Sequence, residues 1–147
     1  MFESDMNITF QTLAKHYMNA PDPKLHIGLF DIEVDFDPKK GFAPPSDPFS
    51  AVTAISIHLS WLDKLVTMCI KPDSMTKEEA QKVCDKFEDT VLFDTEVAML
   101  KFFLDLIEDV DVLSGWNSEG FDIPYMVNRV IRMLGMDYAK KFCLWNM

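Results

Sequence analysis

Long apolar runs are missing from this chain, and so is a targeting segment at its start. No apolar stretch reaches the ~18 residues that a membrane-spanning helix requires. The opening residues 1–5 are acidic and lack the basic start and apolar stretch of a signal peptide. The sequence therefore predicts a cytoplasmic protein with no membrane partner.

Cysteine is scarce and unpaired. The 147 residues include three cysteines, Cys69, Cys84 and Cys143, widely spaced and without a Cys-x-x-Cys pair. An odd number at such spacing argues against a disulfide framework or a zinc site. We expect reduced thiols that lie in the core or near the surface.

Positive charge is also in short supply. Fourteen lysines and arginines face 24 aspartates and glutamates, which gives a net charge of −10. Proteins that wrap duplex DNA carry basic stripes that neutralise phosphates, so this chain is not expected to do so alone. A nuclease is still allowed, because its site needs clustered carboxylates to hold cations.

The remaining composition is that of an ordinary soluble protein, and 147 residues fit one domain. Apolar periodicity and turn residues predict a series of short elements. The expected strands are 26–36, 51–60, 64–70, 90–93 and 111–116, and the expected helices are 8–18, 75–87, 95–109 and 122–134. This order predicts an α/β domain with a mixed central sheet flanked by helices, as in the RNase H-like arrangement.

The first strand is apolar almost throughout, which is typical of a central strand buried on both faces. Near its end stand Asp31 and Glu33, which point to the same side because strand side chains alternate. Two such carboxylates repel each other unless a cation lies between them, and a hard ion such as Mg²⁺ or Mn²⁺ would satisfy both. Alone, such a triplet is more often an ordinary strand end that reaches solvent than a metal site.

A second feature joins the strand at 111–116 to the helix at 122–134. It reads Gly115-Trp116-Asn117-Ser118-Glu119-Gly120-Phe121-Asp122-Ile123-Pro124-Tyr125. Asp122 opens the helix, where a carboxylate serves as a cap or, with its direction fixed, as a metal ligand. Asn117 is able to turn or cap the chain, and Trp116 and Phe121 are expected to be packing residues.

These segments resemble a known family. Phe30-Asp31-Ile32-Glu33-Val34 resembles the first exonuclease motif of family B DNA polymerases, and residues 115–125, continuing into Asn128-Arg129, resemble the second. Similarity to the polymerases of tailed phages extends to Gly41-Phe42-Ala43-Pro44-Pro45 and to Phe2-Glu3-Ser4-Asp5. The resemblance implies a lead-in segment over 1–24 and a partial 3′→5′ proofreading exonuclease domain over 25–147, in the host cytoplasm if the source is viral.

The resemblance also implies roles. Asp31 would bridge two divalent ions, Mg²⁺ or Mn²⁺, Glu33 would complete the shell of one, and Asp122 would act through water on the other. Asn117 would orient the 3′ end of single-stranded DNA. Phe42 would stack on a frayed base, or else anchor its loop on the core.

The family's third motif, Tyr-x-x-x-Asp, does not follow Asp122, where the only later acid is Asp137. We therefore expect a C-terminally incomplete domain that is weak or inactive alone and depends on the remainder of a polymerase. Exposed apolar surface, with the helix at 95–109 as one candidate, would favour a homodimer. A separate DEDD-type nuclease acting on RNA or oligonucleotides, and a non-catalytic module docking onto a partner polymerase chain, stay open as alternatives.

Overall fold

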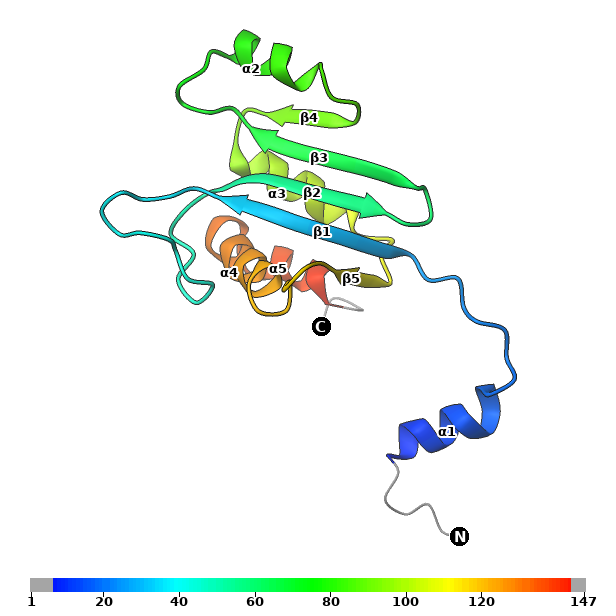
Figure 1. The fold of residues 1–147 in the computed structure, drawn as a ribbon. Helices are drawn as coiled ribbons and strands as arrows, with labels where there is room; N and C mark the ends of the chain where they lie inside the picture. The colour runs from blue at the N-terminus through cyan, green and yellow to red at the C-terminus, as the bar shows by residue number, and fades with distance from the viewer. Residues whose placement is uncertain (1–6, 144–147) are drawn as a thin grey trace.

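A five-stranded mixed sheet forms the centre of the molecule, as the computed structural model shows for residues 7–143 (Figure 1). Its strands are β1 (Ile27–Val34), β2 (Val52–Leu59), β3 (Lys64–Ile70), β4 (Thr90–Phe93) and β5 (Val112–Ser114). Their spatial order is β4-β3-β2-β1-β5. The β1–β2 and β2–β3 pairs are antiparallel, and the β3–β4 and β1–β5 pairs are parallel. This confirms the predicted α/β class with a mixed sheet.

The helices begin and end close to the predicted positions. They are α1 (Ile8–Tyr17), α2 (Lys77–Cys84), α3 (Glu96–Leu106), α4 (Asp122–Leu134), α5 (Met136–Ala139) and the 3-10 turn η1 (Lys140–Phe142). Thr95 starts α3, because its hydroxyl accepts from the backbone N–H of Ala98 at 3.2 Å. Gly135 ends α4 with φ of 95°, a conformation that suits glycine.

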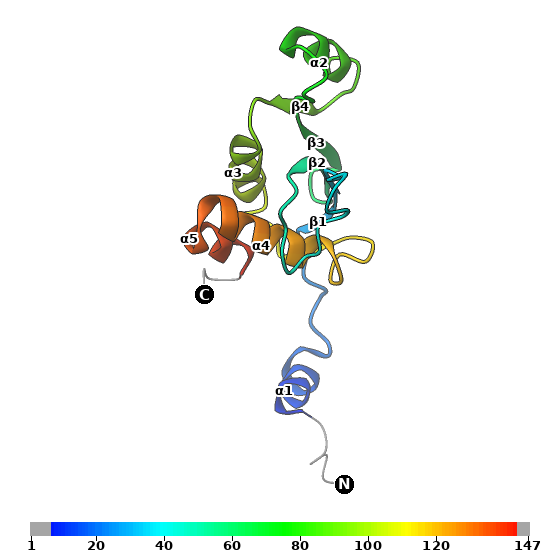
Figure 2. The same cartoon turned by 90° about the vertical axis from the view of Figure 1, so that its left-hand side faces the viewer.

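The core lies between one face of the sheet and the helices α3 and α4 (Figure 2). Alternate residues of β2 and β3 point into it, and α3 contributes Met99, Leu100, Phe103 and Leu104, all fully buried. These four lie at helical spacing on a single stripe. The prediction that α3 is buried on more than one side was wrong, since Lys101 and Asp105 on its other side are exposed.

The opposite face of β1 is open, which corrects the expectation that this strand is buried on both faces. Phe30 and Ile32 are buried against the helices, whereas Leu29, Asp31 and Glu33 are exposed. The strand is central in the sheet, with β2 on one edge and β5 on the other. A central position does not ensure a second covering layer, and in residues 7–143 no helix packs over this part of the sheet.

Helix α1 stands apart from the sheet, at the end of an extended segment that leads into β1 (Figures 1 and 2). It buries none of its residues, and its apolar side chains Ile8, Phe10 and Leu13 are exposed. The Phe2-Glu3-Ser4-Asp5 segment lies outside the described residues. Over residues 7–143, no helix is long and apolar enough to cross a membrane.

Candidate active site

Asp31 and Glu33 lie on the open face of β1. Backbone alternation puts Phe30 and Ile32 into the core, with 3% and 7% of their surfaces exposed, and turns the two acids the other way. On the neighbouring strand β2, Ser56 lies opposite Asp31 and Ala54 lies opposite Glu33. The predicted placement of both carboxylates on one face is therefore confirmed, and their partners on β2 have small side chains.

Asp122 reaches the same strand from the start of α4. Its Oδ1 accepts a hydrogen bond from the backbone N–H of Ile32 at 3.2 Å. Parallel pairing of β5 with β1 ends at Leu29, so Asp122 meets the β1 edge just beyond the last paired residue. The carboxylate is thus held beside Asp31, with 5% of the residue exposed.

The connection from β5 to α4 explains why the motif contains Gly115 and Asn117. A Cβ atom on Gly115 would lie 2.1 Å from the carbonyl oxygen of Phe30, so only glycine allows this approach to β1. Asn117 has φ of 53°, in the left-handed region where asparagine is enriched. Its carbonyl accepts from the N–H groups of Gly120 and Phe121 at 3.0 and 3.1 Å. The predicted turn is confirmed, and it delivers Asp122 to the strand.

The electrostatics of the site link the two aspartates. Burial raises the pKa of the Asp122 carboxyl above its usual value. The Ile32 N–H works against that increase, while the charge of Asp31 adds to it. A divalent cation between the two groups would relieve both the desolvation and the repulsion.

A cleft of about 540 Å³ opens between β1 and the 115–122 turn. Its lining residues are Asp31, Ile32, Trp116, Asn117, Phe121 and Asp122. A second groove of about 450 Å³ continues along the open face of the sheet and shares Asp31 and Trp116 with the first. Three of the predicted site residues, Asp31, Asn117 and Asp122, therefore meet in one cleft, while Glu33 and Phe42 do not line it.

Trp116 is not a packing residue. It is 93% exposed and stands between the two grooves, so the expectation of a core side chain was wrong. The turn directs the Trp116 side chain into solvent. A Gly-Trp-Asn pattern alone does not specify this direction. Phe121 does pack, with its ring centroid 5.3 Å from that of Tyr125.

The oxygen atoms of these carboxylates suit a hard cation, but only part of the expected set of ligands comes together. Within residues 7–143, no three side chains of the histidine, cysteine, aspartate and glutamate types gather closely enough to hold a metal ion. Asp31 and Asp122 place two carboxylates at one cleft, and carboxylate oxygens are the kind of ligand that suits Mg²⁺ or Mn²⁺. The three-carboxylate set that includes Glu33 stays a prediction.

Comparison with known proteins decides the family. Residues 2–144 match the model of the exonuclease domain of DNA polymerase family B. The chain belongs to this exonuclease domain family. It is similar to the DNA-directed DNA polymerase of Escherichia phage RB69, 28% identical over 80% of this chain and 15% of that protein. It is also 44% identical to the enzyme of Enterobacteria phage T4 over 34% of this chain and 6% of that protein.

A herpesvirus protein extends the comparison. The DNA polymerase catalytic subunit of Saimiriine herpesvirus 2 is 28% identical over 80% of this chain and 12% of its own length. The chain thus spans 6–15% of the length of these three relatives. Exonuclease domains of this family use divalent metals and act on DNA as part of a polymerase.

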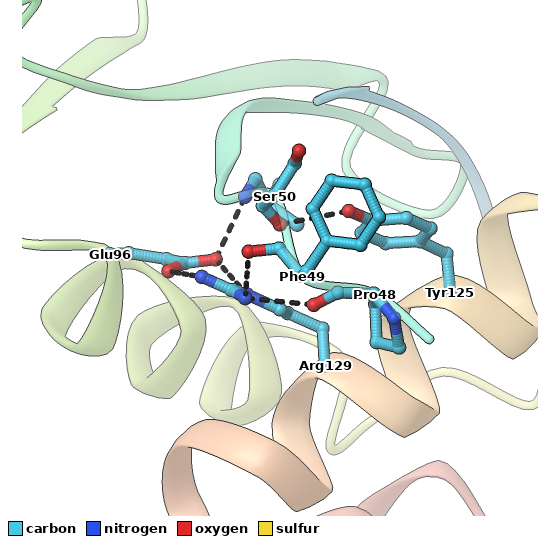
Figure 3. A network of polar contacts seen from close by, with 7 residues as sticks. Pro48, Phe49, Ser50, Glu96, Tyr125 and Arg129 are labelled. Atoms are coloured by element: carbon cyan, nitrogen blue, oxygen red, sulfur yellow. Dashed lines mark hydrogen bonds and ion pairs between the residues drawn. The ribbon is translucent and has the colours of Figure 1, made fainter. Parts of the chain in front are cut away.

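The exonuclease domain also contains a buried polar network that was not predicted from the sequence. Arg129 and Glu96 form an ion pair in which each side chain is 8% exposed, with Nη2 and Oε2 2.6 Å apart (Figure 3). Both residues lie in the apolar stripes of their helices, Arg129 beside Met126 and Val130 and Glu96 beside Met99 and Leu100. A charge inside a buried stripe indicates a buried partner, and that signal was available from the sequence.

Phe42 is exposed in the exonuclease domain and does not anchor its loop on the core. Its side chain is 75% exposed, and its ring centroid lies 5.0 Å from that of Phe36. The loop is anchored instead by Ala43, which is 1% exposed. Asp137, the only acid after Asp122, has a side chain that is 95% exposed and lies 3.5 Å from Lys140.

Proposed function

We propose that this chain carries the 3′→5′ proofreading exonuclease site of a family B DNA-directed DNA polymerase. It would remove the 3′-terminal nucleotide of single-stranded DNA by metal-dependent hydrolysis. The observation that carries the proposal is the convergence of Asp31 and Asp122 on one cleft, with Asp122 fixed to the backbone of Ile32. We also propose the division into a lead-in segment, 1–24, and a partial exonuclease domain, 25–147.

Asp31, Glu33 and Asp122 are the proposed metal ligands, and Mg²⁺ or Mn²⁺ the proposed ions. Bound ions supply Lewis-acid stabilisation to the entering and leaving oxygens of the phosphodiester. The chain's own part is to fix the ligand directions, through the β1 backbone for Asp31 and Glu33 and through the Ile32 N–H for Asp122. Since Asp31 and Asp122 line the cleft and the third proposed ligand, Glu33, does not, the isolated chain should bind metal weakly and cleave slowly or not at all.

Asn117 and Phe42 are the proposed DNA contacts. Asn117 lines the cleft beside Asp122 and is exposed, so its amide is free to bond to the terminal nucleotide. Phe42 presents an exposed ring that suits stacking on an unpaired base, which is tolerant of sequence. The net charge of −10 makes a second polypeptide, the remainder of a polymerase, the proposed source of the basic surface that a DNA strand requires.

Self-association through exposed apolar surface stays a prediction, but the candidate surface is no longer the helix at 95–109. Helix α3 buries its apolar stripe and is unsuitable. Exposed apolar side chains along the second groove include Leu29, Leu65 and Trp116.

The test is a strand-shortening assay with Mn²⁺ and a 5′-labelled single-stranded DNA, run beside an RNA of the same sequence. The wild-type chain and Asp31→Ala are each tested alone and with a polypeptide that carries the Tyr-x-x-x-Asp motif. We expect stepwise loss from the 3′ end of DNA when the wild type and that polypeptide are mixed, and no loss with Asp31→Ala. Cleavage confined to RNA would support a separate nuclease. Binding of the added polypeptide without any cleavage would support a non-catalytic docking module.

A further inference from the structure

Arg129 fastens the loop between β1 and β2 to helix α4. Its Nε and Nη2 donate to Oε1 and Oε2 of Glu96 at 2.8 and 2.6 Å, which is the two-point geometry that arginine forms with carboxylates (Figure 3). Its Nη1 donates to the backbone carbonyls of Pro48 and Phe49 at 2.8 and 3.2 Å. One side chain thereby joins α3, α4 and the loop.

Other contacts reinforce the same attachment. Glu96 Oε1 accepts from the backbone N–H of Val52 at 2.8 Å, where the loop becomes β2. The Tyr125 hydroxyl donates to the Ser50 carbonyl at 2.8 Å, and the Asn128 amide donates to the Pro45 carbonyl at 2.9 Å. The loop segment 45–52 is therefore held mainly through its backbone, so it has a defined position although it has no helix or strand of its own until β2 begins.

The other half of the loop is closed by Asp37. Its Oδ1 accepts from the backbone N–H groups of Lys39 and Lys40 at 2.8 and 3.1 Å, and its carbonyl accepts from Gly41 at 2.8 Å. Phe42 follows this turn directly and leads through buried Ala43 to the segment held by Arg129. The exposed Phe36–Phe42 ring pair thus lies next to a tight turn on one side and a fastened segment on the other.

Stability alone does not explain a buried ion pair. Replacing such a pair with well-packed apolar side chains often leaves stability unchanged or raises it. Arg129 lies about two helical turns after Asp122 on α4. One rigid helix therefore fixes both the carboxylate of the cleft and the position of the loop.

We infer that Arg129, through Glu96, is a positioning residue that holds the Phe36–Phe42 end of the loop at a fixed position relative to Asp122. A DNA strand stacked on Phe42 is then presented to the Asp31–Asp122 cleft. This inference rests on the proposed nuclease function, and it concerns strand placement rather than contact with the reacting phosphate.

Hydrogen exchange tests the fastening itself. Arg129→Lys retains the charge but replaces a planar five-donor group by an ammonium, whose three N–H donors cannot make the four hydrogen bonds of Arg129. We expect exchange in peptides covering 36–50 to accelerate about tenfold, the scale of one charged hydrogen bond, while β1 and α4 stay protected. Arg132→Lys is the matched control, since Arg132 pairs with Asp47 of the same loop but is exposed, and a change within about twofold is expected. Uniform acceleration across the domain, or none, would overturn the inference.

DNA binding tests whether the position of the loop, held by Arg129, matters for the contact between Phe42 and DNA. The probe is a single-stranded oligonucleotide with 2-aminopurine at its 3′ end, titrated in Ca²⁺ against the wild type, Arg129→Lys, Phe42→Ala and the double variant. Each single variant should bind about tenfold more weakly, the scale of one lost stacking contact. The double variant should bind no more weakly than Phe42→Ala, because Arg129 acts through that ring.

The two kinds of failure are distinguishable. Wild-type binding together with losses that multiply in the double variant would overturn the positioning role alone. A wild-type chain that binds no oligonucleotide would refute the strand-binding part of the proposed function, while the exchange experiment still decides whether Arg129 fastens the loop.

Discussion

The carboxylate of Asp122 accepts a hydrogen bond from the backbone N–H of Ile32, a residue 90 positions earlier in the chain. Ile32 lies between Asp31 and Glu33, so this bond joins the two exonuclease motifs at one point of the sheet. The active-site geometry therefore depends on the edge of β1 as much as on the acids.

Asp122→Asn should stabilise the fold at neutral pH. Burial raises the pKa of this carboxyl, so the folded chain favours its protonated form more than the unfolded chain does. The stability from this group is fully present below its ordinary pKa of 3.8 and is lost as pH rises through the higher folded pKa. Asparagine avoids that loss and still accepts from Ile32.

Thermal unfolding at several pH values provides the measurement for Asp122→Asn. At pH 7 the free energy of unfolding should rise by on the order of 1 kcal/mol, and the gain should shrink toward pH 3. Asp73→Asn, at an exposed position outside the site, is the control. A variant less stable than wild type at pH 7 would be evidence against an unfavourable charge at this position.

Gly115→Ala should destabilise the domain. The new methyl group would lie 2.1 Å from the Phe30 carbonyl oxygen, so the β5–β1 contact must open. We expect a loss of about 2–3 kcal/mol in the free energy of unfolding, the upper part of the usual range for overpacking, measured by urea unfolding. Gly41→Ala is the matched control, because a Cβ there meets nothing within 4 Å and only its φ of 80° is strained. That strain should cost about 1–2 kcal/mol, and an equal or larger loss at Gly41 would contradict the account.

Arg129→Met and Arg132→Met should differ in stability although both remove a positive charge from α4. Arg129→Met leaves the buried Glu96 without its ionic partner and should cost about 3–5 kcal/mol. Arg132→Met breaks an exposed pair with Asp47 and should cost under about 1 kcal/mol. Chemical denaturation of both variants measures the difference, and similar losses would argue against a special role for the buried pair.

Cys69 should react slowly with thiol reagents. Burial, helped by the neighbouring Cys84, raises the pKa of Cys69 to about 11, and the thiolate is the reactive form. Exposed Cys143 should therefore be labelled first by an aromatic disulfide at pH 8, and Cys69 should be labelled readily only after unfolding. Mass spectrometry of the labelled peptides identifies the order, and early labelling of Cys69 would contradict it.

Much of the fold could be predicted from the sequence because its signals are local. Alternation in β1, the Thr95 cap and the Gly135 stop each act within a few residues. The convergence of Asp31 and Asp122 on one cleft was expected only through the family motifs, since the two residues lie far apart in the sequence.

The features that could not be predicted depend on which elements pack against each face of the sheet and each side chain. Alternation indicates that Asp31 and Phe30 point to opposite faces, but the same apolar strand fits one or two covering layers. The Gly-Trp-Asn turn likewise gives no direction for Trp116. The partners of Arg129 are a glutamate on another helix and two loop carbonyls, which no local pattern specifies.

Mn²⁺ binding, followed by the electron paramagnetic resonance signal of the free ion, tests the proposed metal site most directly. We expect saturable binding to the wild-type chain that weakens at least about tenfold in both Asp31→Asn and Asp122→Asn, because each variant loses a charged oxygen ligand. Since Asp122→Asn is expected to be the more stable protein, weaker binding would not reflect unfolding. Equal Mn²⁺ binding by the wild type and both variants would contradict the assignment of the site.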